Sequence, residues 1–144
     1  METEQYVIKQ ISIFSENRPG RLAAIAQALG EEKVNILAFS IAEANGFGVV
    51  RALVDHPKKA QAKLQSLGFN SAFTDVIAVK MKDTPGGLFE VAKILGDAGI
   101  NIEYSYAYSG KGGAVLILRV DQVDDAIKKI QASGATLLER SLFH

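Results

Sequence analysis

An internal repeat constrains the fold of this chain more than any other feature of its 144 residues. The stretch DTPGGLFEVAKILGDAGINI, residues 83–102, resembles ENRPGRLAAIAQALGEEKVNI, residues 16–36. Pro85 minus Pro19 is 66, and this offset holds along the chain without a gap. Two copies at so long a period indicate a duplicated domain and not a solenoid. The same offset joins Leu22/Leu88, Gly30/Gly96, Asn35/Asn101, Asp55/Asp121 and Gly68/Gly134.

Each repeat carries a pattern of six elements in the order βαββαβ. Runs of β-branched and aromatic residues, such as VIKQISIFS and SAFTDVIAVKM, predict strands. The stretches LAAIAQAL and LFEVAKIL place apolar residues at i, i+3, i+4 and i+7, which predicts one buried helix face in each repeat. We therefore expect an α+β fold of two ferredoxin-like βαββαβ domains side by side, residues 5–72 and 73–144, each an antiparallel sheet with helices on one face.

Turn-forming residues predict where these elements begin and end. Asn17 and Asp83, two residues ahead of proline, are helix-start signals that place the proline in the first turn. Asp55 and Asp121 are predicted to open the second helix of each repeat, and the hairpins EANGFG and SGKGGA to join the second and third strands. FNSAF is predicted to run straight into the next repeat, and ATLLERS to form the last strand. The glycines predicted to end the first helices are Gly30, and Gly96 with Gly99.

The composition argues against several classes of function. Sixteen basic and sixteen acidic residues cancel, which argues against nucleic acid or a membrane surface as a partner. The chain has no apolar run of about 18 residues and no signal-peptide pattern, so we expect a cytoplasmic protein. With no cysteine and with only His56 and His144, a metal site is not expected. No catalytic set or cofactor motif emerges, so we expect a protein that is not an enzyme.

Other uses of the βαββαβ fold fit the residues poorly. A metal-transfer domain needs paired cysteines, and an RNA-recognition domain needs a basic surface and aromatic residues on its central strands. Tyr104, Tyr106 and Tyr108 share one strand face, but VVRALV and VLILRV hold no aromatic residue, so core packing is the expected role of these tyrosines. SGKGGA lacks the spacing of a phosphate-binding loop.

The Asn/Asp-x-Pro-Gly-x-Leu turn and the Asn-Ile at the second strand, each present twice, resemble the ACT domain. The whole chain is similar to stand-alone tandem ACT proteins, which carry no attached enzyme. The resemblance implies a regulatory protein that binds a free amino acid between two ACT domains, as a homodimer or higher oligomer that acts on a metabolic enzyme. The residues that the resemblance assigns to binding are Asn17, Pro19, Gly20, Arg21, Leu22, Asn35 and Ile36, with Asp83, Pro85, Gly86, Gly87, Leu88, Asn101 and Ile102 in the second repeat.

The chemistry of these residues agrees with such a role and leaves alternatives open. A helix N-terminus offers unpaired N–H groups to a carboxylate, and an asparagine amide can bind both an ammonium and a carboxylate. Asn17 and Asp83 can instead cap helices, Asn35 and Asn101 can satisfy turns, and Arg21, like Arg18, can be solvated surface. The alternative function is a ligand-independent regulatory subunit that pairs its sheet edge with a metabolic enzyme.

The second strand of the first repeat, ILAFSIA, predicts an interface. If Ile36 faces the helices, then Leu37, Phe39 and Ile41 lie on the opposite face of the sheet. An apolar patch on a face without helices is typical of an interface, so we expect the chain to dimerise there. A β-bulge near Asn35 would reverse this assignment of faces.

Overall fold

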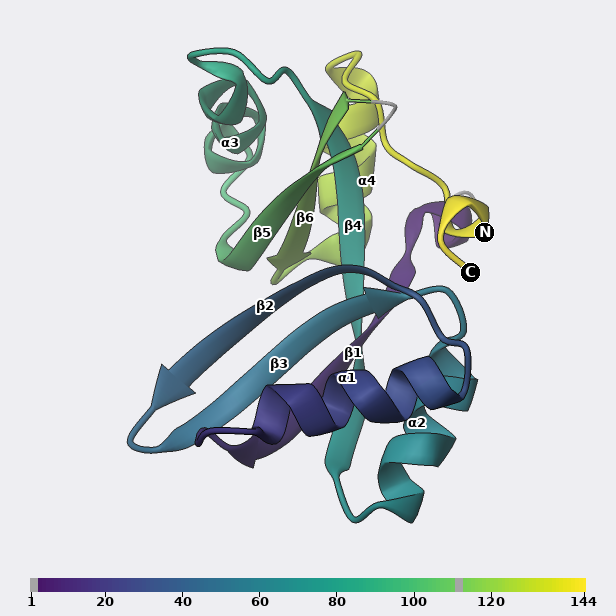
Figure 1. Ribbon diagram of the computed structural model, residues 1–144. Helices are drawn as coiled ribbons and strands as arrows, with labels where there is room; N and C mark the ends of the chain where they lie inside the picture. The colour runs from purple at the N-terminus through teal and green to yellow at the C-terminus, as the bar shows by residue number, and fades with distance from the viewer. Residues whose placement is uncertain (1–2, 111–112) are drawn as a thin grey trace. The chain divides into compact units, whose positions relative to one another are not determined.

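The computed structural model describes residues 3–110 and 113–144, which fold into two compact units (Figure 1). The first-repeat unit comprises Lys9–Thr74 with Phe143–His144. The second-repeat unit comprises Asp75–Leu142 with the described residues up to Ile8. The chain therefore passes from one unit to the other three times.

The first-repeat unit has the predicted order of elements. They are β1 (Ile8–Glu16), α1 (Arg21–Glu31), β2 (Ile36–Ala44), β3 (Phe47–Val54), α2 (Pro57–Ser66) and the first part of β4 (Asn70–Met81). The strands β2-β3-β1 are neighbours in this order and pair antiparallel. Ile25 and Leu29 of α1 and Leu64 of α2 share one buried cluster with Ile11 and Ile13 of β1. Both helices therefore cover the same face of the sheet.

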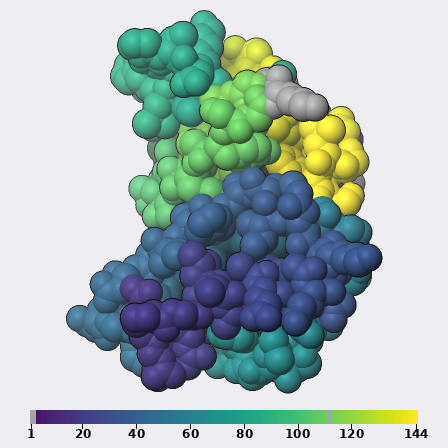
Figure 2. All heavy atoms as spheres, in the orientation of Figure 1, coloured from purple at the N-terminus to yellow at the C-terminus, as the bar shows by residue number. Residues whose placement is uncertain are grey.

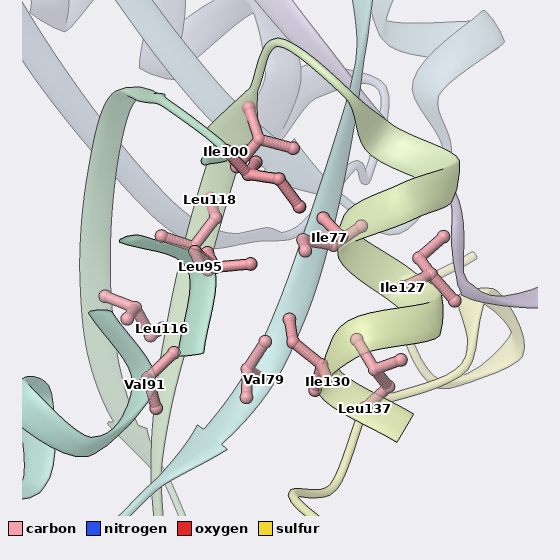
Figure 3. Packing of buried hydrophobic residues seen from close by; sticks show 12 residues of the cluster. Ile77, Val79, Val91, Leu95, Ile100, Leu116, Leu118, Ile127, Ile130 and Leu137 are labelled. Carbon is pink, nitrogen blue, oxygen red and sulfur yellow. The ribbon is translucent and has the colours of Figure 1, made fainter. Parts of the chain in front are cut away.

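The second-repeat unit repeats this arrangement. Its elements are η1 (Glu4–Tyr6), the rest of β4, α3 (Gly87–Asp97), β5 (Ile102–Gly110), β6 (Gly113–Val120), α4 (Val123–Ala132) and η2 (Arg140–Leu142). The strands pair antiparallel in the order β4-β6-β5. Figure 3 shows the core, in which Leu95 of α3 and Ile127 and Ile130 of α4 pack with Ile77 and Val79 of β4.

These two units confirm the predicted α+β fold with ferredoxin-like repeats. The prediction that the last strand of the first repeat continues into the second is also confirmed, because β4 is a single strand. The first hairpin turns at Asn45 and Gly46, which both have a positive φ. In the second hairpin Gly110 pairs with Gly113, and its turn residues, 111 and 112, lie outside the described residues.

The first helix of each repeat begins later than predicted. Helix α1 begins at Arg21, after Gly20 at a φ of 90°, a left-handed conformation that glycine adopts readily. Helix α3 begins in the same way after Gly86, at a φ of 87°. The prediction that proline lies in the first turn of each helix is therefore wrong, and within the described ranges no side-chain hydrogen bond caps either helix, which rules out the alternative role of Asn17 and Asp83 as caps.

The ends of these helices also differ from the prediction. Gly30 and Gly96 lie inside α1 and α3 and do not end them. Gly99 follows α3 with a φ of 71°, as predicted. Its counterpart is Lys33, whose φ of 58° gives the same left-handed turn at a residue without glycine's freedom. The matching glycines Gly30 and Gly96 therefore did not locate the ends of the two helices.

The stretch ATLLERS does not form the predicted last strand. It makes one isolated bridge, between Leu137 and Val79, and then enters η2. The guanidinium group of Arg140 donates hydrogen bonds at 2.7 Å to the carbonyl oxygens of Val7 and Glu4. These bonds hold the C-terminal turn against η1.

A bulge in β2 changes which residues face the helices. The register of β2 against β3 shifts between Ile36 and Ala38. The extra residue places Phe39 and Ile41 on the helix-covered face, where they lie in hollows beside α1. The prediction that Leu37, Phe39 and Ile41 share the face without helices is therefore wrong for Phe39 and Ile41.

The tyrosines of β5 do not belong to the core. Tyr104, Tyr106 and Tyr108 are half-buried and alternate with residues that stand opposite Leu118 and Leu116 of the core cluster. They therefore lie on the sheet face without helices, and the prediction of core packing is wrong. Partial burial raises the pKa of the Tyr108 hydroxyl above its ordinary value.

Candidate functional site

The turn between β1 and α1 forms the polar end of the candidate site in the first repeat. Asn17, Arg21 and Leu22, three of the predicted binding residues, line a small hollow of about 20 Å³ together with Ser15 and Glu16. A hydrogen bond of 2.8 Å from the backbone N–H of Asn17 to the carbonyl of Gly46 ties this turn to the β2–β3 hairpin. Figure 2 shows the turn and α1, in purple to dark blue, at the surface.

Arg21 brings an unsatisfied hydrogen-bond donor to this hollow. Its Nε is buried and has no hydrogen-bond partner within the part of the chain that the structure describes. An unpaired donor shielded from water is unfavourable, and a ligand oxygen that reached this nitrogen would remove that cost. Arg18 differs, because it is exposed and pairs at 3.3 Å with Glu16. Pro19 and Gly20 form the exposed bend between these arginines.

An apolar groove continues from the polar hollow along α1. Its volume is about 200 Å³, and it lies between α1 and the helix-covered face of β2 and β3. Leu22, Ile25 and Val50 line both the groove and the hollow, so the two lie next to each other. Ile36 and Phe39 line the groove from β2. Ile36 was predicted as a binding residue, whereas Phe39 was missed because the bulge has no clear sequence signal.

The second repeat builds its turn differently. A Cβ added to Gly87 would collide with the carbonyl oxygen of Lys82, so α3 begins close against the end of β4. Gly87 also lines an open cavity of about 620 Å³ between α3, the end of β4 and residues 133–136. The other predicted residues of this turn are exposed: Asp83, Pro85, Gly86 and Leu88.

The strand-opening asparagines take part in a repeated backbone lock. The carboxylate Oδ1 of Asp55 accepts a hydrogen bond of 2.9 Å from the backbone N–H of Asn35. Asp121 accepts the equivalent bond, of 3.0 Å, from Asn101. The backbone N–H of each aspartate in turn donates to the carbonyl of its asparagine, at 3.1 and 3.2 Å. This reciprocal pairing fixes the start of β2 and β5, while the side chains of Asn35 and Asn101 remain exposed. Ile102 follows half-buried at the start of β5.

The role predicted for the two aspartates is therefore wrong. The second helices begin at Pro57 and Val123, and the residues that precede them are His56 and Gln122. The repeated aspartate indicated that these two positions matter, but the sequence pattern did not show that each carboxylate binds the backbone N–H of Asn35 or Asn101. The pKa of the Asp55 carboxyl lies below its usual value. Partial desolvation alone would raise this pKa, but the hydrogen bond from Asn35 and the His56 ring, 2.9 Å away, outweigh that effect.

The described residues include no group of three or more histidine, cysteine, aspartate or glutamate side chains placed to hold a metal ion. Within the same residues, no helix combines the length and apolar character needed to cross a membrane. The polar side chains that line the hollow are those of Ser15, Glu16, Asn17 and Arg21.

The two units each have an antiparallel sheet with two helices on one face and a glycine before the first helix, and together they define a duplicated α+β fold. The chain belongs to the ACT domain family, because residues 6–139 match the model of an ACT domain pair. ACT domains are regulatory domains, so the comparison assigns the chain a regulatory class and names no ligand.

The same fold occurs in solved structures. Protein BT0572 from Bacteroides thetaiotaomicron is 34% identical, with 94% of each chain covered and a TM-score of 0.89. The ligand-free regulatory subunit of aspartate kinase from Thermus thermophilus is 16% identical, over 90% of this chain and 95% of that one, with a TM-score of 0.66. The regulatory subunit of aspartate kinase from Thermus flavus is 14% identical, with 90% of this chain and 94% of that chain covered and a TM-score of 0.61. These two share the fold. No curated protein matches.

Proposed function

We propose that the chain is a regulatory protein that binds a free amino acid at the turn between β1 and α1 and at the start of β2. The observation that carries this proposal is the buried Nε of Arg21, which has no hydrogen-bond partner among residues 3–110 and 113–144 and belongs to a side chain that lines a hollow together with Asn17. A guanidinium is suited to a carboxylate, and the exposed amide of Asn35 offers both a donor and an acceptor. The equivalent second-repeat residues around Asp83, Gly87 and Asn101 form part of the same proposal.

The proposal includes self-association and a partner. Strand β2 is the edge strand of the first-repeat unit, so its outer backbone groups are available to pair with a second copy of the chain or with a metabolic enzyme. We place this assembly in the cytoplasm, with the repeats 5–72 and 73–144 as its two ACT domains. The bound amino acid acts by favouring one packing arrangement of these domains over another.

A thermal-shift screen of the purified chain against the twenty amino acids at millimolar concentration tests this function. A ligand that binds only the folded state raises the melting temperature. We expect a rise with one amino acid or a few related ones, and its loss when Asn17→Ala and Asn35→Ala are combined. Asn70→Ala, at an exposed position at the start of β4, is the matched control and should keep the rise. A flat screen, repeated by calorimetry, would favour the ligand-independent subunit.

A further inference from the structure

We infer that the first repeat selects a free amino acid with a large apolar side chain, and that the hydrocarbon part of the ligand lies in the groove between α1 and β2. The inference rests on the proposed function and adds the chemical class of the ligand. It also limits this apolar ligand to one molecule per chain, because the second repeat has Gly87, Ser105 and Ala107 at the positions of Arg21, Phe39 and Ile41, so any amino acid bound there is of another class.

The polar end of the site matches the charged end of an amino acid. Arg21, whose Nε has no hydrogen-bond partner among the described residues, lines the same small hollow as Glu16, a carboxylate that also pairs at 3.3 Å with the exposed Arg18. A guanidinium and a carboxylate side by side complement a zwitterion, whose carboxylate meets Arg21 and whose ammonium meets Glu16. The hollow has room for about one water molecule, so only the oxygen of a head group enters it and the rest of the ligand must extend elsewhere.

The groove provides that extension, and its lining is apolar. It begins at Leu22 and Ile25, which it shares with the hollow, and reaches Phe39 over a floor that includes Ile13 and Ala52. Leu22 is 38% exposed and Phe39 is 51% exposed, so apolar surface remains for a ligand to cover. The free energy gained by covering apolar surface grows with the area covered, so a long hydrocarbon side chain should bind more tightly than a short or polar one.

The second repeat shows what the same fold looks like without this lining. At the offset of 66, Phe39 corresponds to Ser105 and Ile41 to Ala107, and Gly87 stands in place of Arg21. The strand registers agree with this correspondence, since Phe39 lies opposite Ala52 and Ser105 opposite the equivalent Leu118. The second repeat thus lacks the guanidinium of Arg21 and the large apolar side chains of Phe39 and Ile41, and it supplies the substitutions for a test.

Isothermal titration calorimetry on the full chain tests the inference. Leucine, isoleucine, methionine and phenylalanine represent the proposed class, and alanine, serine, aspartate and lysine are the comparison set. We expect a member of the apolar set to bind at one molecule per chain. The comparison set should bind more than tenfold less tightly, since one methylene group in an apolar pocket changes selectivity by about 10–200-fold.

A variant that carries Phe39→Ser and Ile41→Ala gives the first repeat the residues of the second. We expect it to fold and to lose at least about tenfold in affinity for the apolar ligand. Phe14→Ser is the matched control: Phe14 is also partly exposed, at 45%, but it follows Ile13 on the strand and lies on the other sheet face. The control should bind as the unaltered chain does.

The possible failures are distinguishable. If no amino acid binds, the proposed function fails and this inference fails with it. If alanine or serine binds as tightly as leucine, the function stands and the inference is overturned. The inference is also overturned if the double variant binds normally, or if ultracentrifugation shows that it loses only self-association, which would make the groove a contact between subunits. Should the double variant not fold by circular dichroism, the ligand ranking of the unaltered chain decides.

Discussion

The same substitution should have opposite effects at the two glycines of α3. Gly87 is the first residue of the helix, and a Cβ there would collide with the carbonyl oxygen of Lys82. Gly96 lies in the last turn with no heavy atom within 4 Å of an added Cβ. Gly96→Ala should therefore raise the free energy of unfolding by about 0.4–1 kcal/mol, because alanine restricts the unfolded chain. Gly87→Ala should lower it by about 1–3 kcal/mol, since backbone atoms must shift to make room.

Urea unfolding of both variants, followed by circular dichroism, measures these changes, and calorimetry gives the melting temperatures. A shift of about 2–4 °C is expected for each kcal/mol in a chain of this size. Gly30→Ala is a control in α1, where an added Cβ also meets open space, and it should stabilise as Gly96→Ala does. If Gly87→Ala stabilised the chain as much as Gly96→Ala, the close start of α3 against β4 would be wrong.

Three further predictions concern the aspartate lock and the two cores. Asp55→Ala should lower the free energy of unfolding by about 1–2 kcal/mol in urea titrations, because the N–H of Asn35 loses its charged acceptor. The pKa of Asp55 is depressed, so its contribution is present above its unfolded pKa of about 3.9 and is lost as the pH falls through the folded pKa. Asp55→Asn should therefore cost stability near pH 7 and very little near pH 2, and an equal cost at both would exclude this linkage. Leu29→Ala and Leu95→Ala, both fully buried, should each cost about 2–5 kcal/mol by calorimetry, and a smaller loss would show that the core can collapse around the gap.

The sequence was sufficient for the element order because the signals that specify it are periodic and occur twice. The spacing of Leu22, Ile25 and Leu29 predicts the buried side of α1, and Ile25 and Leu29 are buried there, whereas Leu22 stays exposed at the edge of the groove. Arg21 was predicted as a binding residue from the resemblance alone. The unpaired state of its Nε depends on the surrounding fold, which no local pattern encodes.

The features that the sequence did not predict are those set by one extra residue or by a distant partner. The bulge in β2 reverses the assignment of Phe39 to a sheet face, and nothing in ILAFSIA distinguishes a regular strand from a bulged one. Lys33 adopts the left-handed conformation that Gly99 adopts in the second repeat, and lysine gives no sequence signal for such a turn. Asp55 bonds to a backbone group 20 residues away, which a cap motif does not anticipate.

The passage of the chain between the two units has a consequence for how the protein can be dissected. A cut between residues 72 and 73 removes Val7 and Glu4, whose carbonyls bind Arg140, from the second-repeat unit. The same cut removes His144, whose ring contacts the carbonyl of Val54 at 3.0 Å, from the first-repeat unit. Neither half of the sequence then holds all of its own fold. The intact polypeptide, and not the single repeat, is therefore the smallest piece that can be transplanted or fused to an enzyme without loss.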